Sequence, residues 1–225
     1  MAKILYVEDN LSLSFVTSVQ LKKRGYQVVT CKDGKEALST FNKDIFDLCI
    51  LDVMLPIIDG FELAKKIRYH NVHIPIIFLS ARSMQEDKIE GLKIGGDDYL
   101  TKTFDIDELC LKIEVFLKRK EINSGQKNTY EIGKFRLDVT EQILSLDGKE
   151  ISLTLKEAQL LSLFAQKQNT IVKREHILIN LWGKNDYFLG RSLDVFISKL
   201  RKQLKQDENV SIENIRGVGF RLNVA

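Results

Sequence analysis

Three apolar stretches of this chain each lead into charged residues. The run FDLCILD ends at Asp52, the run KILYVED ends at the pair Glu8-Asp9, and a third, shorter run precedes Lys102. Apolar runs of this length with polar boundaries are typical of buried parallel strands. Because an open parallel sheet binds ligands beyond the carboxyl ends of its strands, we expect these four charged side chains at one edge. Such a cluster predicts a Mg²⁺ site at which a phosphoryl group is transferred.

The composition indicates a soluble globular protein with two ordinary domains. The 225 residues are 44% apolar and 29% charged, which is enough for two small cores. No apolar stretch reaches the roughly 18 residues that cross a bilayer, and the chain enters a strand-like run at once, so we expect neither a membrane span nor a signal peptide. Cys31, Cys49 and Cys110 lack metal-ligand spacing and are expected to be reduced thiols in the cytoplasm.

A change in charge divides the chain near its middle. Residues 1–120 carry no net charge, and residues 121–225 carry the entire net charge of +3. The polar stretch KEINSGQKNTY has no helical periodicity and is typical of a linker. We therefore predict a first domain over residues 1–120, a linker over 121–128 and a second domain over 129–225.

The first half alternates strand-like and helical patterns. Five such units predict an α/β domain, a doubly wound five-stranded parallel sheet with helices on both faces. Gly25 is a stop signal after the first helical pattern, and Asp33 is an N-cap for the second. The strands are expected at 3–8, 26–31, 46–52, 75–80 and 97–101, and the helices at 11–24, 34–43, 59–70, 84–95 and 105–120.

The second half predicts an α+β domain. Short alternating segments joined by tight turns such as Asp147-Gly148 indicate a small antiparallel sheet. Thr154 precedes a helical pattern with Glu157 three residues later, which is the signature of a capping box. The strands are expected at 130–133, 135–138, 143–146, 149–153, 210–214 and 219–224, and the helices at 155–167, 173–182 and 189–205.

The last predicted helix has an apolar and a basic face. Leu193, Ile197, Leu200 and Leu204 fall on one stripe. A helix that docks by one face and presents basic and small side chains on the other suits the DNA major groove. A solvated basic helix is the alternative for this segment taken alone. The outward side chains are expected to be Arg191, Val195, Ser198 and Lys202, with Ser192 and Lys199 beside them and Arg201 on a flank.

Four segments of the first half occur together in a fixed order. The acidic pair is followed by DVMLPIIDG, which begins at Asp52, then by IIFLSA, and then by GGDDYLTK, which ends at Lys102. Together they resemble the receiver domain of bacterial two-component response regulators over residues 1–120. The resemblance implies that Asp52 takes a phosphoryl group from a sensor histidine kinase and becomes 4-aspartylphosphate. It implies no enzyme activity beyond Mg²⁺-dependent self-phosphorylation and self-dephosphorylation.

The resemblance also assigns roles around Asp52. The metal ligands would be Asp9, Asp52 and the backbone carbonyl of Met54, with Glu8 acting through a water. Lys102 would pair with the acceptor carboxylate and then with the phosphoryl group, Ser80 would donate its hydroxyl to a phosphoryl oxygen, and Tyr99 would rotate inward as the switch.

One residue departs from the receiver pattern. Thr103 follows Lys102 where a proline with a cis peptide bond is usual. A cis bond before a residue other than proline costs about 2.5–4 kcal/mol. Either the bond is trans and Lys102 is aimed differently, or the fold holds the strain.

A second family pattern lies on the fourth helix, the fifth strand and the fifth helix. In the OmpR/PhoB subfamily, this face forms a symmetric homodimer on activation, through salt bridges around an apolar patch. A solvated helical face with ordinary charge alternation is the alternative. The matching positions are Ile89, Leu92 and Cys110 for the patch, and the pairs Lys88–Glu108, Asp97–Lys112 and Asp98–Arg119 across the two-fold axis.

The second half resembles the winged helix-turn-helix domain of the same subfamily. RSLDVFISKLRKQL and NIRGVGFRL carry this resemblance. It implies double-stranded DNA with tandem half-sites as a partner and RNA polymerase as a further one, without a membrane partner. Phe196 and Trp182 would pack in the core. Lys199 would read a base edge, Arg191, Ser198, Arg201 and Lys202 would contact phosphates or add base contacts, and Arg216 would enter the minor groove.

The expected function is therefore that of a response regulator that dimerises on phosphorylation and regulates transcription by sequence-specific DNA binding. One alternative is a constitutive dimer that binds DNA without phosphorylation, for which Thr103 is the sequence support. Another is a Mg²⁺-dependent phosphatase, although Val53 and Met54 follow Asp52 where such an enzyme would need a second acidic residue.

Overall fold

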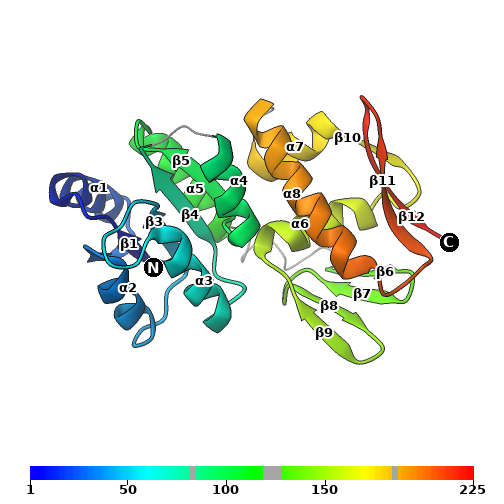
Figure 1. Ribbon diagram of the computed structural model, residues 1–225, viewed down its shortest axis with the longest axis horizontal. Coiled ribbons are helices and arrows are strands. Elements are labelled where there is room, and N and C mark those ends of the chain that lie inside the picture. Colours follow the sequence, from blue (N-terminus) through cyan, green and yellow to red (C-terminus); the bar gives the residue numbers. More distant parts are fainter. Residues whose placement is uncertain (82–84, 119–127, 184–186) are drawn as a thin grey trace. The chain divides into compact units, whose positions relative to one another are not determined.

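The computed structural model describes residues 1–81, 85–118, 128–183 and 187–225 (Figure 1). The chain divides into two compact units, Met1–Ser124 and Gly125–Ala225. The predicted linker 121–128 lies outside the described residues except for its last position. In the described segments, no helix combines the length and the apolar character needed to cross a membrane.

The first unit contains a parallel sheet with strand order β2-β1-β3-β4-β5 (Figure 1). This order and the strand direction confirm the predicted doubly wound fold. The residues of β3 and β4 are buried along their whole length, as expected for central strands covered on both faces. The strands are β1 (Lys3–Val7), β2 (Gln27–Cys31), β3 (Leu48–Asp52), β4 (Ile76–Ser80) and β5 (Asp98–Thr101).

Five helices in the described part of this unit cover the sheet. Helices α1 and α5 contact each other and one face, and α2, α3 and α4 lie together on the other face. The side chains of Asn10, Asp33 and Asp59 cap the N-termini of α1, α2 and α3. The helices are α1 (Leu11–Lys23), α2 (Gly34–Phe41), α3 (Gly60–His70), α4 (Gln85–Ile94) and α5 (Ile106–Lys118).

The aromatic side chain of Phe78 packs directly against glycine backbone beneath α4. Its ring is fully buried and meets the ring of Phe61 edge to face, with 5.2 Å between centroids. A Cβ atom placed on Gly96 would lie 2.5 Å from a ring carbon of Phe78. The turn between α4 and β5 therefore needs glycine at position 96.

Gly96→Ala is expected to lower the free energy of unfolding of the first unit by about 1–3 kcal/mol, because the added methyl overpacks the core. Urea unfolding of the full chain would measure this loss. Phe78→Leu in the same chain should recover part of it, because the smaller side chain vacates the space. A double variant that loses the sum of the two single effects would contradict this steric account.

The described residues of the second unit form two antiparallel sheets and three helices. The four-stranded sheet has the order β6-β7-β8-β9, and the three-stranded sheet has the order β10-β12-β11. This arrangement confirms the predicted α+β winged-helix fold, although β10, which has only three residues, was not predicted. The elements are β6 (Thr129–Ile132), β7 (Phe135–Asp138), β8 (Ile143–Leu146), β9 (Lys149–Ser152), α6 (Leu155–Ala165), β10 (Ile171–Lys173), α7 (Arg174–Trp182), α8 (Tyr187–Leu204), β11 (Val210–Ile215) and β12 (Gly219–Val224).

Helix α8 docks on this unit through its predicted leucine-rich stripe, which is buried. Phe196 is also buried and lies 5.8 Å from the ring of Trp182 between centroids, so both aromatic residues pack as predicted. Val195 and Ser192 were expected on the outward side but are buried as well. The apolar side of α8 is therefore wider than the single stripe, and the outward face is correspondingly narrower.

Candidate functional site

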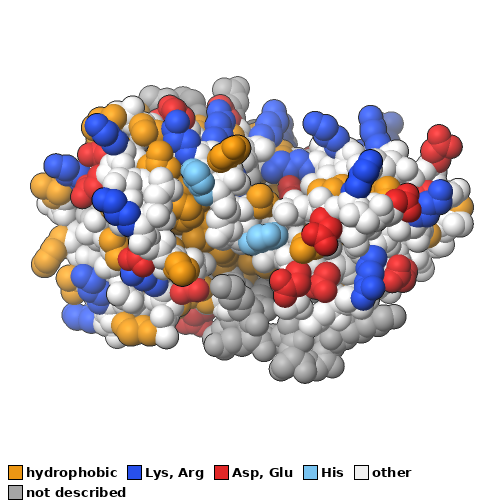
Figure 2. All heavy atoms as spheres, turned by 90° about the horizontal axis from the view of Figure 1, so that it is seen from below, with side chains coloured by type: hydrophobic (Ala, Val, Ile, Leu, Met, Phe, Trp, Pro, Cys, Tyr) orange, Lys and Arg blue, Asp and Glu red, His pale blue; other side chains and the backbone are white. Residues whose placement is uncertain are grey.

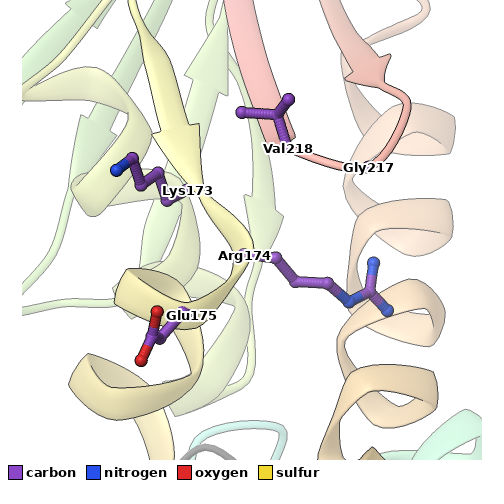
Figure 3. A pocket seen from close by; sticks show the side chains of 5 residues that line it. All are labelled: Lys173, Arg174, Glu175, Gly217 and Val218. Atoms are coloured by element: carbon purple, nitrogen blue, oxygen red, sulfur yellow. The ribbon is translucent and has the colours of Figure 1, made fainter.

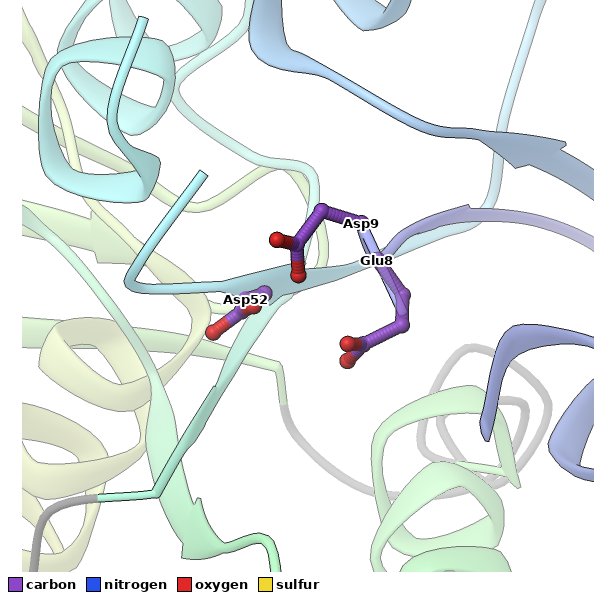
Figure 4. A group of neighbouring side chains, drawn as sticks. All are labelled: Glu8, Asp9 and Asp52. Atoms are coloured by element: carbon purple, nitrogen blue, oxygen red, sulfur yellow. The ribbon is translucent and has the colours of Figure 1, made fainter. Parts of the chain in front are cut away.

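Three carboxylates meet at the carboxyl edge of the parallel sheet, where the sequence predicts them. Glu8 and Asp9 directly follow β1, and Asp52 ends β3, so the two neighbouring strands deliver them to one place (Figure 4). One oxygen from each carboxylate lies within 4.8 Å of the others. Glu8 and Asp52 are buried, whereas Asp9 is exposed. We call these three residues the acidic site.

Lys102 bridges two carboxylates of the acidic site. Its Nζ atom donates to Glu8 Oε1 and to Asp52 Oδ2, at 2.7 Å in both cases. The Lys102–Thr103 peptide bond is trans. The lysine is thus aimed at Asp52 even though threonine stands where the receiver pattern has proline.

The electrostatics of the acidic site favour a bound cation. Burial raises the pKa of Glu8, and the hydrogen bond from Lys102 only partly offsets this effect. Burial alone would lower the pKa of Lys102, but its hydrogen bonds to Asp52 and Glu8 raise that pKa above the ordinary value. Glu8 Oε2 is buried without a hydrogen-bond partner among the described residues. These hard oxygen atoms fit Mg²⁺.

Ser80 and Tyr99 occupy the neighbouring strands. Ser80 ends β4 and is buried, and its backbone carbonyl accepts from the backbone N–H of Lys102 at 2.7 Å. Tyr99 is half-buried in β5, with its ring 6.4 Å from that of Phe78 between centroids. The sequence therefore places both residues on the strands beside the acidic site.

The predicted apolar patch on α4 and α5 differs from the observed surface. Ile89 is half-buried, but Leu92 and Cys110 are buried within the first unit and present almost no surface. The neighbouring Leu111 is 64% exposed instead. A one-residue step along a helix turns a side chain by about 100°, so Cys110 faces the core and Leu111 faces outward.

The predicted charge pairs of this face are also partly wrong. Asp98, not Asp97, is the partner of Lys112, at 2.6 Å and within the same chain. Asp97 is completely buried and accepts from Arg68, so it cannot face Lys112 of a second chain. Glu108 is half-buried, and the side chains of Lys88 and Arg119 lie outside the described residues.

The outer surface of the second unit presents most of the predicted DNA-contacting residues. Figure 2 shows basic and acidic side chains mixed over the face that it draws. Lys199 is half-buried and lies 3.4 Å from Glu157. Arg201 donates through Nε to the backbone carbonyl of Ile212, which holds the base of its guanidinium against β11. The predicted DNA-contacting residues that are exposed are Arg191, Ser198, Arg201, Lys202 and Arg216.

The same two-part architecture occurs in known proteins. Residues 4–114 match the family described as "Response regulator receiver domain", and residues 148–222 match "Transcriptional regulatory protein, C terminal". Transcriptional regulatory protein RprY of Bacteroides fragilis is 43% identical over 221 residues, a match that covers 98% of this chain and 94% of RprY. The chain is a response regulator of the OmpR/PhoB family.

Two further comparisons agree with this assignment. Response regulator ArlR of Staphylococcus aureus is 38% identical over 221 residues, which are 98% of this chain and 99% of ArlR. The structure of DrrB, an OmpR/PhoB homologue from Thermotoga maritima, is 31% identical with a TM-score of 0.53, covering 99% of both chains. Like its family, this response regulator belongs to a two-component system and binds DNA as a transcription factor rather than as an enzyme.

Two surfaces of this response regulator were missed by sequence reasoning. The buried side of α1 carries hydroxyl groups, whereas Leu11, Phe15 and Val16 are exposed. The helical spacing gave the signal, because Leu11, Phe15 and Val16 fall on a different side of α1 from the buried Leu21. Because α1 follows the acidic site directly, its apolar surface lies beside that site.

The second surface that sequence reasoning missed surrounds Arg174, at the start of α7. Figure 3 shows its side chain extending towards α8, across a cavity of about 450 Å³ beside the turn between β11 and β12. Its guanidinium pairs with Asp194 at 2.9 Å, and its backbone N–H donates to Val218 at 3.1 Å. Arg174 therefore connects α7 both to α8 and to the turn between β11 and β12, which we call the wing.

Proposed function

We propose that this response regulator accepts a phosphoryl group on Asp52 from a sensor histidine kinase in the cytoplasm, dimerises, and then binds tandem DNA half-sites. The observation that supports this most is the position of Lys102, which contacts Asp52 at 2.7 Å within the acidic site. An ammonium in that place offsets negative charge on the acceptor and on an incoming phosphoryl group. Both families matched by the chain fit the same sequence of events.

The chemistry assigned to Asp52 is nucleophilic. A carboxylate oxygen of Asp52 forms a bond to phosphorus as the bond between phosphorus and the kinase histidine nitrogen breaks. Asp9, Asp52 and the Met54 carbonyl would hold Mg²⁺, with Glu8 acting through a water. The bound metal would neutralise charge on the transferring oxygens, which is most of what phosphoryl transfer requires from a protein.

The switch is proposed to run from Ser80 and Tyr99 to the face formed by α4, β5 and α5. The phosphoryl group adds about two negative charges and three acceptor oxygens, and the Ser80 hydroxyl would donate to one of these oxygens. Tyr99 already packs against Phe78 and would turn into the space that the Ser80 side chain leaves when it moves towards the phosphoryl group. On the dimer face, we propose Ile89 and Leu111 as the apolar contact. Lys88, Glu108, Asp98, Lys112 and Arg119 are the proposed charged contacts.

The DNA contacts are proposed for the outward side of α8 and for the wing. Arg191, Ser198 and Lys202 are exposed on one face of α8 and suit the major groove, and Arg216 suits the minor groove. Two half-sites bound by one dimer raise the affinity through effective concentration, without new contacts in either domain. RNA polymerase is a further proposed partner at the promoter.

The test couples assembly to DNA binding. Sedimentation and fluorescence anisotropy would follow the full chain with Mg²⁺ and acetyl phosphate, on a duplex with two half-sites selected from a random pool. We expect a monomer that becomes a dimer and binds more tightly once phosphorylated, with binding that weakens steeply as salt is raised. A dimer that binds equally without phosphodonor would instead indicate the constitutive regulator.

Phe15→Ser is expected to slow phosphotransfer from the partner kinase by roughly tenfold and to leave acetyl phosphate labelling unchanged. The Phe15 side chain is 69% exposed beside the acidic site, and losing a buried aromatic contact at a protein interface typically costs more than about 1 kcal/mol. Ile45→Ser is the matched control, since Ile45 is 86% exposed but precedes β3 at the opposite edge of the sheet. Equal effects of both variants would contradict a docking role for α1.

A further inference from the structure

The carboxylate of Glu157 is buried in the capping box of α6. Glu157 Oε2 accepts from the backbone N–H of Thr154 at 3.0 Å, and Thr154 Oγ1 accepts from the backbone N–H of Glu157. Only 4% of Glu157 is exposed. A buried ionised carboxylate needs a compensating charge as well as a hydrogen bond, and the capping box supplies only the hydrogen bonds.

Lys199 of α8 supplies that charge. Its Nζ atom lies 3.4 Å from Glu157 Oε1, the oxygen that the capping box leaves available. The Lys199 side chain is 25% exposed, and its ammonium also lies 5.6 Å from the ring centre of Phe196. Its neighbours Ser198 and Lys202 are both exposed. Lys199 thus points back towards α6, whereas Ser198 and Lys202 on the same helix are exposed.

A base contact would draw Lys199 away from this pair. If its ammonium moved to a guanine edge in the major groove, Glu157 would remain buried without a cation. The outward face of α8 offers other DNA-contacting groups that carry no such penalty. Arg191, Ser198 and Lys202 are spaced by seven and four residues, which places them on one helical face.

We infer that Lys199 is a positioning residue for α8, the helix proposed to enter the major groove, and not a base-reading residue. Through Glu157, it holds α8 against α6, so that the exposed face of α8 is presented to the DNA. The inference rests on the proposed DNA binding and changes the role that the family resemblance implies for this position. Sequence preference then comes from the exposed face of α8.

The test is a double-mutant cycle on the full chain, with variants Lys199→Met, Glu157→Gln and both together. Glutamine keeps an oxygen for the Thr154 N–H but removes the charge that Lys199 compensates. Affinity would be measured by fluorescence anisotropy on a duplex selected by the wild type, and on duplexes with each base pair replaced in turn. Circular dichroism would establish that every variant is folded at the temperature used.

A positioning role predicts that Lys199→Met weakens binding to the selected duplex by roughly tenfold in the wild-type chain and by much less in the Glu157→Gln chain. The order of base preferences at each position should not change. Lys202→Met is the control for direct contact. It should reduce the slope of the logarithm of affinity against the logarithm of salt by about one, whereas Lys199→Met should leave that slope nearly unchanged.

Three results would overturn the inference. The first is a loss of preference at one base pair with Lys199→Met, of equal size with and without Glu157→Gln, as expected of a base-reading lysine. The second is no loss of affinity at all with a folded Lys199→Met chain, while Lys202→Met weakens binding as expected. The third is a wild-type chain that selects no duplex, which would overturn the proposed function together with the inference.

Discussion

Arg68→Met lowers the free energy of unfolding of the first unit by about 3–5 kcal/mol, because it leaves the carboxylate of Asp97 buried without its cation. Arg68 donates to Asp97 Oδ2 at 2.7 Å and to the Gly95 carbonyl at 2.9 and 2.7 Å. The two side chains are 9% and 1% exposed. The guanidinium therefore holds the end of α3 to the turn between α4 and β5. The loss is a large part of the stability of an ordinary domain.

Urea unfolding of the receiver signal in the full chain measures this effect. Lys66→Met is the matched control, since Lys66 lies on the same helix in an exposed pair with Glu62 at 3.3 Å and should cost less than about 1 kcal/mol. Replacing Asp97 by leucine in the Arg68→Met chain should recover part of the loss, because no buried charge then remains. Similar losses for Arg68→Met and Lys66→Met would show that Asp97 finds another partner.

Lys102→Met is expected to slow phosphorylation of Asp52 by roughly 10²–10³-fold, the size of effect found when one aligned electrostatic contact is removed from a reaction site. The variant should also be less stable in the absence of metal, since Glu8 and Asp52 are both buried and lose the ammonium that they share. Added Mg²⁺ should restore more stability to the variant than to the wild type. A divalent cation would compensate the same carboxylates.

The rate is followed by the appearance of phosphorylated chain after acetyl phosphate is added, and the stability by thermal unfolding over a range of Mg²⁺ concentrations. Lys93→Met is the control, because Lys93 is an exposed lysine of α4 away from the acidic site. A Lys102→Met chain that is phosphorylated as fast as the control would contradict the role proposed for Lys102. A normal rate with normal stability would remove the electrostatic account altogether.

The fold follows closely from local signals in the sequence. Apolar runs with polar ends located the five parallel strands, and the capping box at Thr154 and Glu157 located the start of α6. Convergence of the acidic site was predictable because strand order places the ends of β1 and β3 side by side. The short strand β10 was not predicted, because three residues are too few to show an alternating pattern.

Side-chain directions were harder to predict than elements. Cys110 and Val195 were expected on outward faces, but the helices bury both. Asp97 was expected at a dimer contact, yet its buried carboxylate accepts a hydrogen bond from Arg68 of α3. Lys199 is of a residue type that can read bases, but it lies beside Glu157, which stands more than forty positions earlier in the chain. The partner of Asp97 and the acidic neighbour of Lys199 are both distant in sequence, and no local pattern reveals either.

The most direct test of the account is whether Asp52 carries the phosphoryl group. Intact-mass spectrometry of the full chain with Mg²⁺ and acetyl phosphate should show the gain of one phosphoryl group. The gain should disappear in Asp52→Asn and when the metal is chelated. A wild-type chain that remains unmodified, or an Asp52→Asn chain that is labelled to the same extent, would contradict the central claim.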